Sequence, residues 1–303
     1  MKFLYMLESV RMPVLNEFML LITHLGEETA FLVIALVMFW CVDKRRGYYI
    51  LSVGFIGTIL NQFMKMCFRV PRPFEADPNF HCLPAAESEA TGFSFPSGHT
   101  QSSVGTFGGL AYTEKKKWLM ILFICIAVLV PFSRMYVGVH TPQDVLVAAA
   151  IAVALIFVVK PLVLDENGKY MPWLLGMMAL LAVGYVLFVS LYKFPEDVNQ
   201  ERIASGIESG YTLLGALLGL LVVYIVDEKW LDFSTKAVWW AQILKVILGL
   251  GAVLIVKSGL KSMLNAVFGA LAGRSVRYFL IVIVAGILWP LSFRFFAKLG
   301  RKD

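Results

Sequence analysis

Long stretches without a charged residue constrain this chain more than any other feature. Residues 47–64, 171–192 and 211–226 contain no Asp, Glu, Lys or Arg. Runs of about 18–20 apolar residues are long enough to cross the hydrocarbon core of a bilayer as helices. Soluble domains are usually about 45–50% apolar, whereas this chain is 59% hydrophobic with a mean hydropathy of +0.74. The sequence therefore predicts an all-α fold, a polytopic transmembrane helical bundle.

The positive charges lie between the apolar stretches and do not form one continuous patch. Basic clusters occur at residues 44–46 and 115–117 and in the tail at Lys298, Arg301 and Lys302. A nucleic-acid-binding protein concentrates its basic residues on one face, so the net charge of +6 does not indicate nucleic acid as a partner. Cytoplasmic loops of membrane proteins are rich in Lys and Arg, which places these clusters in the cytoplasm.

About ten membrane-crossing segments follow from this pattern, with both termini in the cytoplasm. The predicted segments are residues 14–25, 29–42, 47–66, 100–112, 118–133, 144–164, 171–192, 211–226, 238–256 and 276–293. The segment at 100–112 is rich in small residues, which allow helix backbones to approach closely. We therefore expect it to be buried among the others.

Three polar islands interrupt the apolar chain, and alternation of the segments brings all three to the same membrane face, opposite the basic clusters. They read Lys65-x6-Arg72-Pro73, Pro96-Ser97-Gly98-His99 and Ser133-Arg134-x5-His140-x3-Asp144. Ionisable groups near membrane depth are costly and usually functional. Cationic side chains, two histidines and one carboxylate can together converge on a single anionic group.

These islands resemble the signature of the type 2 phosphatidic acid phosphatase superfamily, K-x6-R-P, P-S-G-H and S-R-x5-H-x3-D. Every specified position is present, and the resemblance covers about residues 29–164. It implies a six-helix phosphatase core within residues 1–165. The apolar stretches at 166–303 lie outside the resemblance and are expected to form a C-terminal transmembrane extension. The resemblance also implies an enzyme, a phosphoric monoester or diphosphate hydrolase that works through a phosphohistidine intermediate.

The resemblance implies a role for each residue of the site. His140 is expected to be the nucleophile, Asp144 to orient its ring and His99 to act as the general acid and base. The phosphate-binding residues are expected to be Lys65, Arg72, Ser97, Gly98 and Arg134. Because three cations already surround the phosphoryl group, we expect no metal and no cofactor.

Structural explanations also exist for single members of the site. Thr141 and Pro142 form a typical helix start in which Asp144 serves as a cap. Ser97 is a common helix cap, and Lys65 alone could be a lysine that reaches the membrane surface along its apolar stem. Asn61 and Gln62, one turn before Lys65, suit either helix packing or orientation of Lys65.

The predicted substrate is a membrane lipid phosphate: a polyprenyl diphosphate, phosphatidate, phosphatidylglycerophosphate or a sphingoid-base phosphate. A lipid phosphotransferase of the same fold and a non-catalytic lipid-phosphate binding or transport protein remain alternatives. Hydropathy excludes a soluble haloperoxidase.

We expect a multi-pass protein of the plasma (inner) membrane, with an endoplasmic reticulum membrane as the alternative, and an active site on the extracytoplasmic face. The oligomeric state stays open, with a homo-oligomer among the options.

Overall fold

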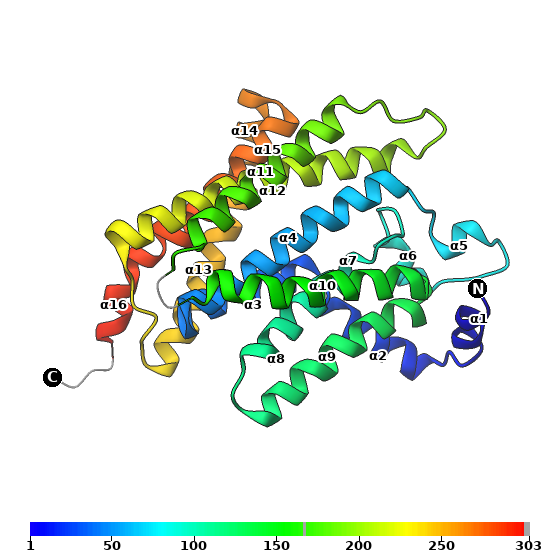
Figure 1. The fold of residues 1–303 in the computed structure, drawn as a ribbon, viewed down its shortest axis with the longest axis horizontal. Coiled ribbons are helices and arrows are strands. Elements are labelled where there is room, and N and C mark those ends of the chain that lie inside the picture. The colour runs from blue at the N-terminus through cyan, green and yellow to red at the C-terminus, as the bar shows by residue number, and fades with distance from the viewer. Residues whose placement is uncertain (166–167, 300–303) are drawn as a thin grey trace. The chain divides into compact units, whose positions relative to one another are not determined.

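The structure is a computed structural model that describes residues 1–165 and 168–299, all of them in helices or in the turns and irregular segments between helices (Figure 1). Within these residues, seven helices are long and apolar enough to cross a membrane. The number rises to eight if Pro13–His24 and Glu28–Val42, which meet at 53°, form one broken span. The predicted all-α membrane bundle is therefore confirmed.

The chain folds into two compact units, each assembled from separate parts of the sequence. The first unit comprises Met1–Leu32, Ile50–Pro161 and Tyr192–Gly206, and the second comprises Val33–Tyr49, Leu162–Leu191 and Ile207–Asp303. Helices α3, α4, α10 and α12 contribute to both units. The sequence boundary expected near residue 165 stays a prediction, because it concerns a catalytic core and an extension and not spatial units.

The first unit holds the catalytic signature. Its elements are α1 (Lys2–Ser9), α2 (Pro13–His24), the start of α3 (Glu28–Val37), most of α4 (Lys44–Phe68), α5 (Pro73–Ala76), α6 (Pro84–Ser88), α7 (Gly98–Ser103), η2 (Val104–Gly108), α8 (Gly109–Thr113), α9 (Lys117–Tyr136), most of α10 (Pro142–Val163) and the start of α12 (Gln200–Val226).

The second unit is built mainly from the C-terminal helices. Its further elements are η1 (Met38–Val42), α11 (Met171–Leu191), η3 (Asp227–Leu231), α13 (Trp239–Gly259), α14 (Lys261–Phe268), α15 (Ala270–Ile283), η4 (Val284–Leu288), η5 (Pro290–Ser292) and α16 (Phe293–Lys298). Within this unit the Trp40 indole donates to the carbonyl of Ala285 (2.9 Å), so η1 is fixed to η4.

The N-terminus lies beside the loop that follows the first polar island, whereas the sequence predicted it on the membrane face opposite the islands. The Tyr5 hydroxyl donates to Asp77 (2.8 Å), and Arg11 donates to the carbonyls of His81 (2.6 Å) and Tyr136 (3.0 Å). These contacts hold α1 against the loop that follows α4 and against the end of α9. If Pro13–His24 and Glu28–Val42 form one broken span, one crossing separates the N-terminus from the cluster at residues 44–46.

Helix α2 is too short to be the separate span that the sequence predicted. Its 12 residues extend about 18 Å, whereas the hydrocarbon core is about 30 Å thick. Asn16 accepts a hydrogen bond from the Tyr136 hydroxyl (2.8 Å), and Thr23 accepts one from Arg134 (2.7 Å). Both ends of α2 therefore rest on the last turn of α9, beside which it lies in Figure 1.

The predicted fourth segment is an unbroken run of α7, η2 and α8, from Gly98 to Thr113. Val104, Phe107 and Leu110 are all buried, as the small residues of this segment predicted. Helix α9 differs, since Trp118, Ile121 and Val128 are well exposed. A helix with such an outer surface is stable only where lipid covers it.

Candidate active site

The three polar islands meet at one short segment, residues 92–97, of which the sequence singled out only Pro96 and Ser97. The Lys65 ammonium donates to the carbonyl of Phe93, and Arg72 Nε donates to the carbonyl of Gly92 (2.9 Å). The Asn61 amide donates to the carbonyl of Pro96 (3.3 Å). The 92–97 segment therefore positions the first island through its backbone carbonyls.

His140 lies between a guanidinium group and a carboxylate. Arg72 Nη1 is 2.8 Å from His140 Nε2, and Asp144 Oδ2 is 3.4 Å from His140 Nδ1. A guanidinium has only donors, so Nε2 must accept and the ring proton must sit on Nδ1, facing Asp144. The ring is 1% exposed. This tautomer leaves the lone pair of Nε2 on the side of the cations.

Burial holds the pKa of His140 well below its usual value, and the positive charges of Arg72 and Arg134 act in the same direction. His140 lies in the turn between α9 and α10, outside both membrane-spanning helices. An imidazole with a lowered pKa is neutral at pH 7. Its Nε2 therefore carries the unprotonated lone pair that a nucleophile needs, and in this structure that lone pair accepts from Arg72.

Asp144 combines the two roles that the sequence left open. Its Oδ2 accepts from the backbone N–H of Thr141 (2.7 Å) and from the hydroxyl of Ser94 (2.7 Å), while Thr141 Oγ1 accepts from the Asp144 N–H (3.3 Å). The Asp144 carboxylate therefore both caps the start of α10 and faces the ring of His140. Its main-chain oxygen accepts from the N–H of Ser97 (3.0 Å), which ties the second island to the third.

The second island begins α7. The Ser97 hydroxyl caps this helix by accepting from the N–H (3.4 Å) and the hydroxyl (3.0 Å) of Thr100. Gly98 packs near Asn61, whose Oδ1 would lie 3.7 Å from an added Cβ. His99 follows directly, and its Nε2 is buried without a hydrogen-bond partner among the described residues.

Arg134 projects from the last turn of α9 and is 1% exposed. Its Nη1 donates to Thr23, while its Nε is buried and unpartnered within the described part of the chain. Buried polar atoms normally have partners, and exceptions at a cluster of charges are typical of a ligand site. Arg134 Nε and His99 Nε2 are two such atoms, and both belong to the predicted site.

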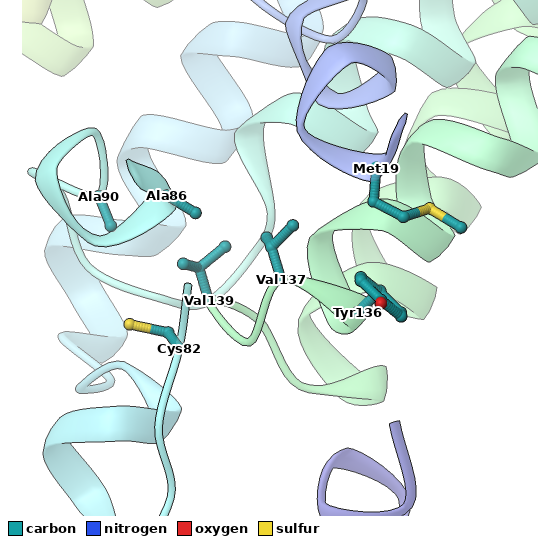
Figure 2. Close-up of a cluster of buried hydrophobic side chains, with 7 residues drawn as sticks. All are labelled: Met19, Cys82, Ala86, Ala90, Tyr136, Val137 and Val139. Carbon is teal, nitrogen blue, oxygen red and sulfur yellow. The ribbon is translucent and has the colours of Figure 1, made fainter. Parts of the chain in front are cut away.

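An apolar cluster supports the turn that carries His140. It contains Met19, Cys82, Ala86, Ala90, Tyr136, Val137 and Val139. Figure 2 shows these side chains gathered around the segment that leads from α9 to His140. The Leu83 N–H donates to the carbonyl of Val137 (2.9 Å), so the long loop after α4 is anchored there. Contacts of this kind make the loop a structural part of the site.

Sequence reasoning missed several residues that the structure places at the site. Ser94 contacts Asp144, Thr23 contacts Arg134, and Arg202 at the start of α12 pairs with Glu75 beside Arg72. Ser94 and Thr23 have no signal of their own, because a hydroxyl group suits many places in a membrane protein. Arg202 was missed because its position beside the site depends on the tertiary fold.

Among the described residues, one group has the donors and spacing for a metal ion. The ligand atoms of His24, Glu27 and Glu89 lie within 4.8 Å of one another. His24 already pairs with Glu27, and both His24 and Glu89 are exposed. None of the three belongs to the predicted catalytic set, so the expected absence of a metal stays a prediction.

Comparison with known families identifies two matching segments. Residues 45–168 match the PAP2 superfamily, and residues 211–302 match the transmembrane extension of PAP2 superfamily phosphatases. The first segment contains all three polar islands, and the second contains none of them.

Several characterised proteins are similar to this chain. Phosphatidylglycerophosphatase B of Bacillus subtilis is 34% identical over 164 residues, which are 50% of this chain and 76% of that protein. Undecaprenyl-diphosphatase of Sulfolobus acidocaldarius is 33% identical over 134 residues, 44% of this chain and 63% of that protein. A probable sphingosine-1-phosphate phosphatase of Dictyostelium discoideum is 28% identical over 239 residues, 71% of this chain and 55% of that protein. No solved structure matches the chain.

Proposed function

The chain belongs to the PAP2 superfamily and is a multi-pass membrane lipid phosphatase, and we propose that it works through a phosphohistidine on His140. The observation that carries this mechanism is the environment of the His140 ring. Arg72 donates to Nε2 at 2.8 Å, and Asp144 faces Nδ1 at 3.4 Å. A neutral ring with a directed lone pair beside cationic groups is suited to attack an electrophilic phosphorus.

In the first half-reaction, a bond forms between His140 Nε2 and phosphorus while the bond from phosphorus to the lipid oxygen breaks. His99 donates a proton to that leaving oxygen. Lys65, Arg72 and Arg134 balance the charge of the phosphoryl oxygens, with the arginines offering planar forks. Phosphoryl transfer depends mainly on such positioning and charge neutralisation.

In the second half-reaction, water attacks the phosphohistidine. His99, now deprotonated, accepts a proton from that water, the phosphorus–nitrogen bond breaks, and inorganic phosphate leaves. His140 and His99 return to their starting states, so each cycle consumes one lipid phosphate and one water molecule. Each of the two steps needs the same three cations, which fits the burial of all three near His140.

The proposed substrates are the lipid mono- and diphosphates named above. The similar proteins support this range, since their names are those of a phosphatidylglycerophosphatase, a polyprenyl diphosphatase and a sphingosine-1-phosphate phosphatase. We further propose that the protein resides in the plasma membrane with its site on the extracytoplasmic face. A lipid could then keep its chains in the outer leaflet while its phosphate reaches His140.

Trapping of the phosphoenzyme tests the mechanism. Purified protein in detergent with a chelator is mixed with a lipid phosphate labelled with ³²P at the scissile group and quenched in alkali, in which phosphohistidine survives. We expect acid-labile label on the wild type, and neither label nor multi-turnover release with His140→Ala.

His81→Ala is the matched control, because the exposed His81 ring contacts Glu8 (3.5 Å) outside the proposed catalytic set. Alanine also keeps the backbone carbonyl that accepts from Arg11. The variant should keep both the label and the turnover. Sustained phosphate release by His140→Ala would refute the assignment of the nucleophile. Activity that disappears in chelator and returns with added magnesium or zinc would refute metal independence.

A further inference from the structure

An ion pair contributed by α12 lies against the catalytic signature. Arg202 Nη1 donates to Glu75 Oε2 at 2.9 Å, and Nη2 donates to Oε1, so the guanidinium binds the carboxylate in a bidentate manner. The side chain of Arg202 is 11% exposed and that of Glu75 is 33% exposed. The guanidinium therefore faces inward, and the carboxylate is the more accessible partner.

Arg202 is one contact away from two of the proposed phosphate-binding cations. Glu75 Oε2 also accepts from the backbone N–H of Arg72 (2.8 Å), whose side chain reaches His140. On its other side, the Arg202 guanidinium lies 5.7 Å from the ring centre of Phe93, whose carbonyl accepts from Lys65. The pair thus borders the site at α5 and at the 92–97 segment.

Three N–H donors converge on the Glu75 carboxylate: two from Arg202 and one from the Arg72 backbone. A planar guanidinium fork joined by a backbone amide is a receptor for any oxyanion with two adjacent oxygens, and phosphate fits it as well as carboxylate does. Glu75 therefore occupies a position in which a phosphate group of a ligand could replace it.

The charge balance indicates when such a replacement is favourable. Apart from His99, whose proton passes to the leaving oxygen, Lys65, Arg72 and Arg134 carry three positive charges and Asp144 carries one negative charge, which leaves two to match the dianion of a single phosphate ester. Arg202 and Glu75 cancel each other. A lipid with a second phosphate adds at least one more negative charge, and Arg202 is a cation placed to balance it.

We propose that Arg202 binds a second, non-scissile phosphate of the substrate, with Glu75 as its partner while the site is empty. This inference rests on the proposed function and narrows its substrate class. A lipid diphosphate and a lipid that carries a phosphomonoester beside a phosphodiester share this chemistry. With a diphosphate, His140 Nε2 bonds to the terminal phosphorus and the bridging phosphorus–oxygen bond breaks. The lipid monophosphate leaves with the bridging oxygen, which His99 protonates, and water later releases the phosphate from His140.

Two matched substrate pairs test the proposal in detergent micelles. Farnesyl diphosphate is compared with farnesyl monophosphate, and phosphatidylglycerophosphate with phosphatidate. For Arg202→Ala we expect kcat/KM to fall about 10- to 100-fold on whichever lipid with two phosphates is the substrate, the size of a lost charged hydrogen-bonding partner. The matched monophosphate should lose no more than about threefold. Arg202→Lys should restore part of the loss, because it keeps the charge and not the fork.

Arg274→Ala is the matched control, since Arg274 pairs with Glu208 within the second unit, and it should leave both substrate ratios unchanged. The pair of lipids on which Arg202→Ala is selective identifies the source of the second phosphate. Equal losses on mono- and diphosphates would overturn the role of Arg202 and assign the pair to holding α12 against α5. A wild type that releases phosphate from none of the four lipids would overturn the proposed function itself, and this inference with it.

Discussion

At the scale of single residues, the Asp144 carboxylate controls the geometry of the site. Its Oδ2 accepts from Ser94 and from the Thr141 N–H at 2.7 Å each, while His140 Nδ1 stands farther off at 3.4 Å. Hydrogen bonds to a carboxylate fix its position and stabilise its charged form. The two shorter contacts therefore hold Asp144 so that a small rotation of the His140 ring completes the third.

We predict that Ser94→Ala lowers kcat about tenfold with little change in KM. Ser94 is fully buried, and its hydroxyl is one of the two short donors to Asp144. Removing a hydrogen bond to a charged group has an energy that corresponds to about a tenfold change in rate. Steady-state kinetics on one lipid phosphate measure the effect, with Ser88→Ala as control because Ser88 is exposed in α6. An unchanged kcat for Ser94→Ala would show that Thr141 alone positions Asp144.

At the scale of elements, close backbone approach between helices sets the position of His99. Gly26 lies in the turn between α2 and α3, and a Cβ added there would be 2.7 Å from the Val130 side chain and 3.0 Å from the His99 carbonyl. Only a residue without a side chain lets this turn pack directly on α7 and α9. The turn at Gly26 thus packs directly against His99 and helps to fix its position.

We predict that Gly26→Val lowers kcat at least tenfold while the protein stays folded. The new side chain must displace the turn or His99, and a shift of about 1 Å at a catalytic group can cost about a hundredfold in rate. Gly176→Ala is the control, since an added Cβ there meets no atom within 4 Å. Thermal unfolding in detergent, followed beside kcat, separates displacement from unfolding. Wild-type kcat in Gly26→Val would show that the turn moves freely away from His99.

Hydropathy and spacing predicted the elements that carry the signature, because long apolar runs leave few choices in a bilayer. The segments predicted at 47–66, 118–133 and 144–164 coincide with α4, α9 and α10. The stretches predicted at 14–25 and 29–42 are also helices, but they pass for a membrane span only together, as a bent pair. The separate first span was predicted wrongly, since an apolar run of 12 residues looks alike in a span and in a helix packed on α9. The role of Gly92 and Phe93 was not predicted, because backbone carbonyls that accept from Arg72 and Lys65 have no sequence pattern.

At the scale of the whole molecule, α9 relates the site to the basic clusters. Its 20 residues extend about 30 Å, the thickness of the hydrocarbon core. Lys115 and Lys116 precede its first turn, whereas Arg134 and the His140 turn lie at its other end. The positive-inside rule favours a cytoplasmic position for the lysines, which supports the proposal that the site lies on the extracytoplasmic face.

Cys82, in the loop beside the site, is not a suitable probe of that face, although the sequence places it in a polar loop. Its side chain belongs to the apolar cluster beneath the loop. Burial and the neighbouring Glu87 raise the pKa of its thiol to about 11. A thiol that is both covered and protonated reacts slowly with labelling reagents. Ser88 in α6 is exposed and differs from cysteine by one atom, so a cysteine at this position is a more suitable labelling site.

We predict that Ser88→Cys is labelled from outside the cell in a variant whose four native cysteines are replaced. Helix α6 is held to the His140 turn by the hydrogen bond from Leu83 to Val137, so Ser88 reports on the face of the site. A membrane-impermeant maleimide should modify it in intact cells. Lys115→Cys, at the far end of α9, should react only after permeabilisation. If Lys115→Cys reacts in intact cells and Ser88→Cys does not, the topology is inverted, and the lipid phosphate must then reach His140 from the cytoplasmic leaflet.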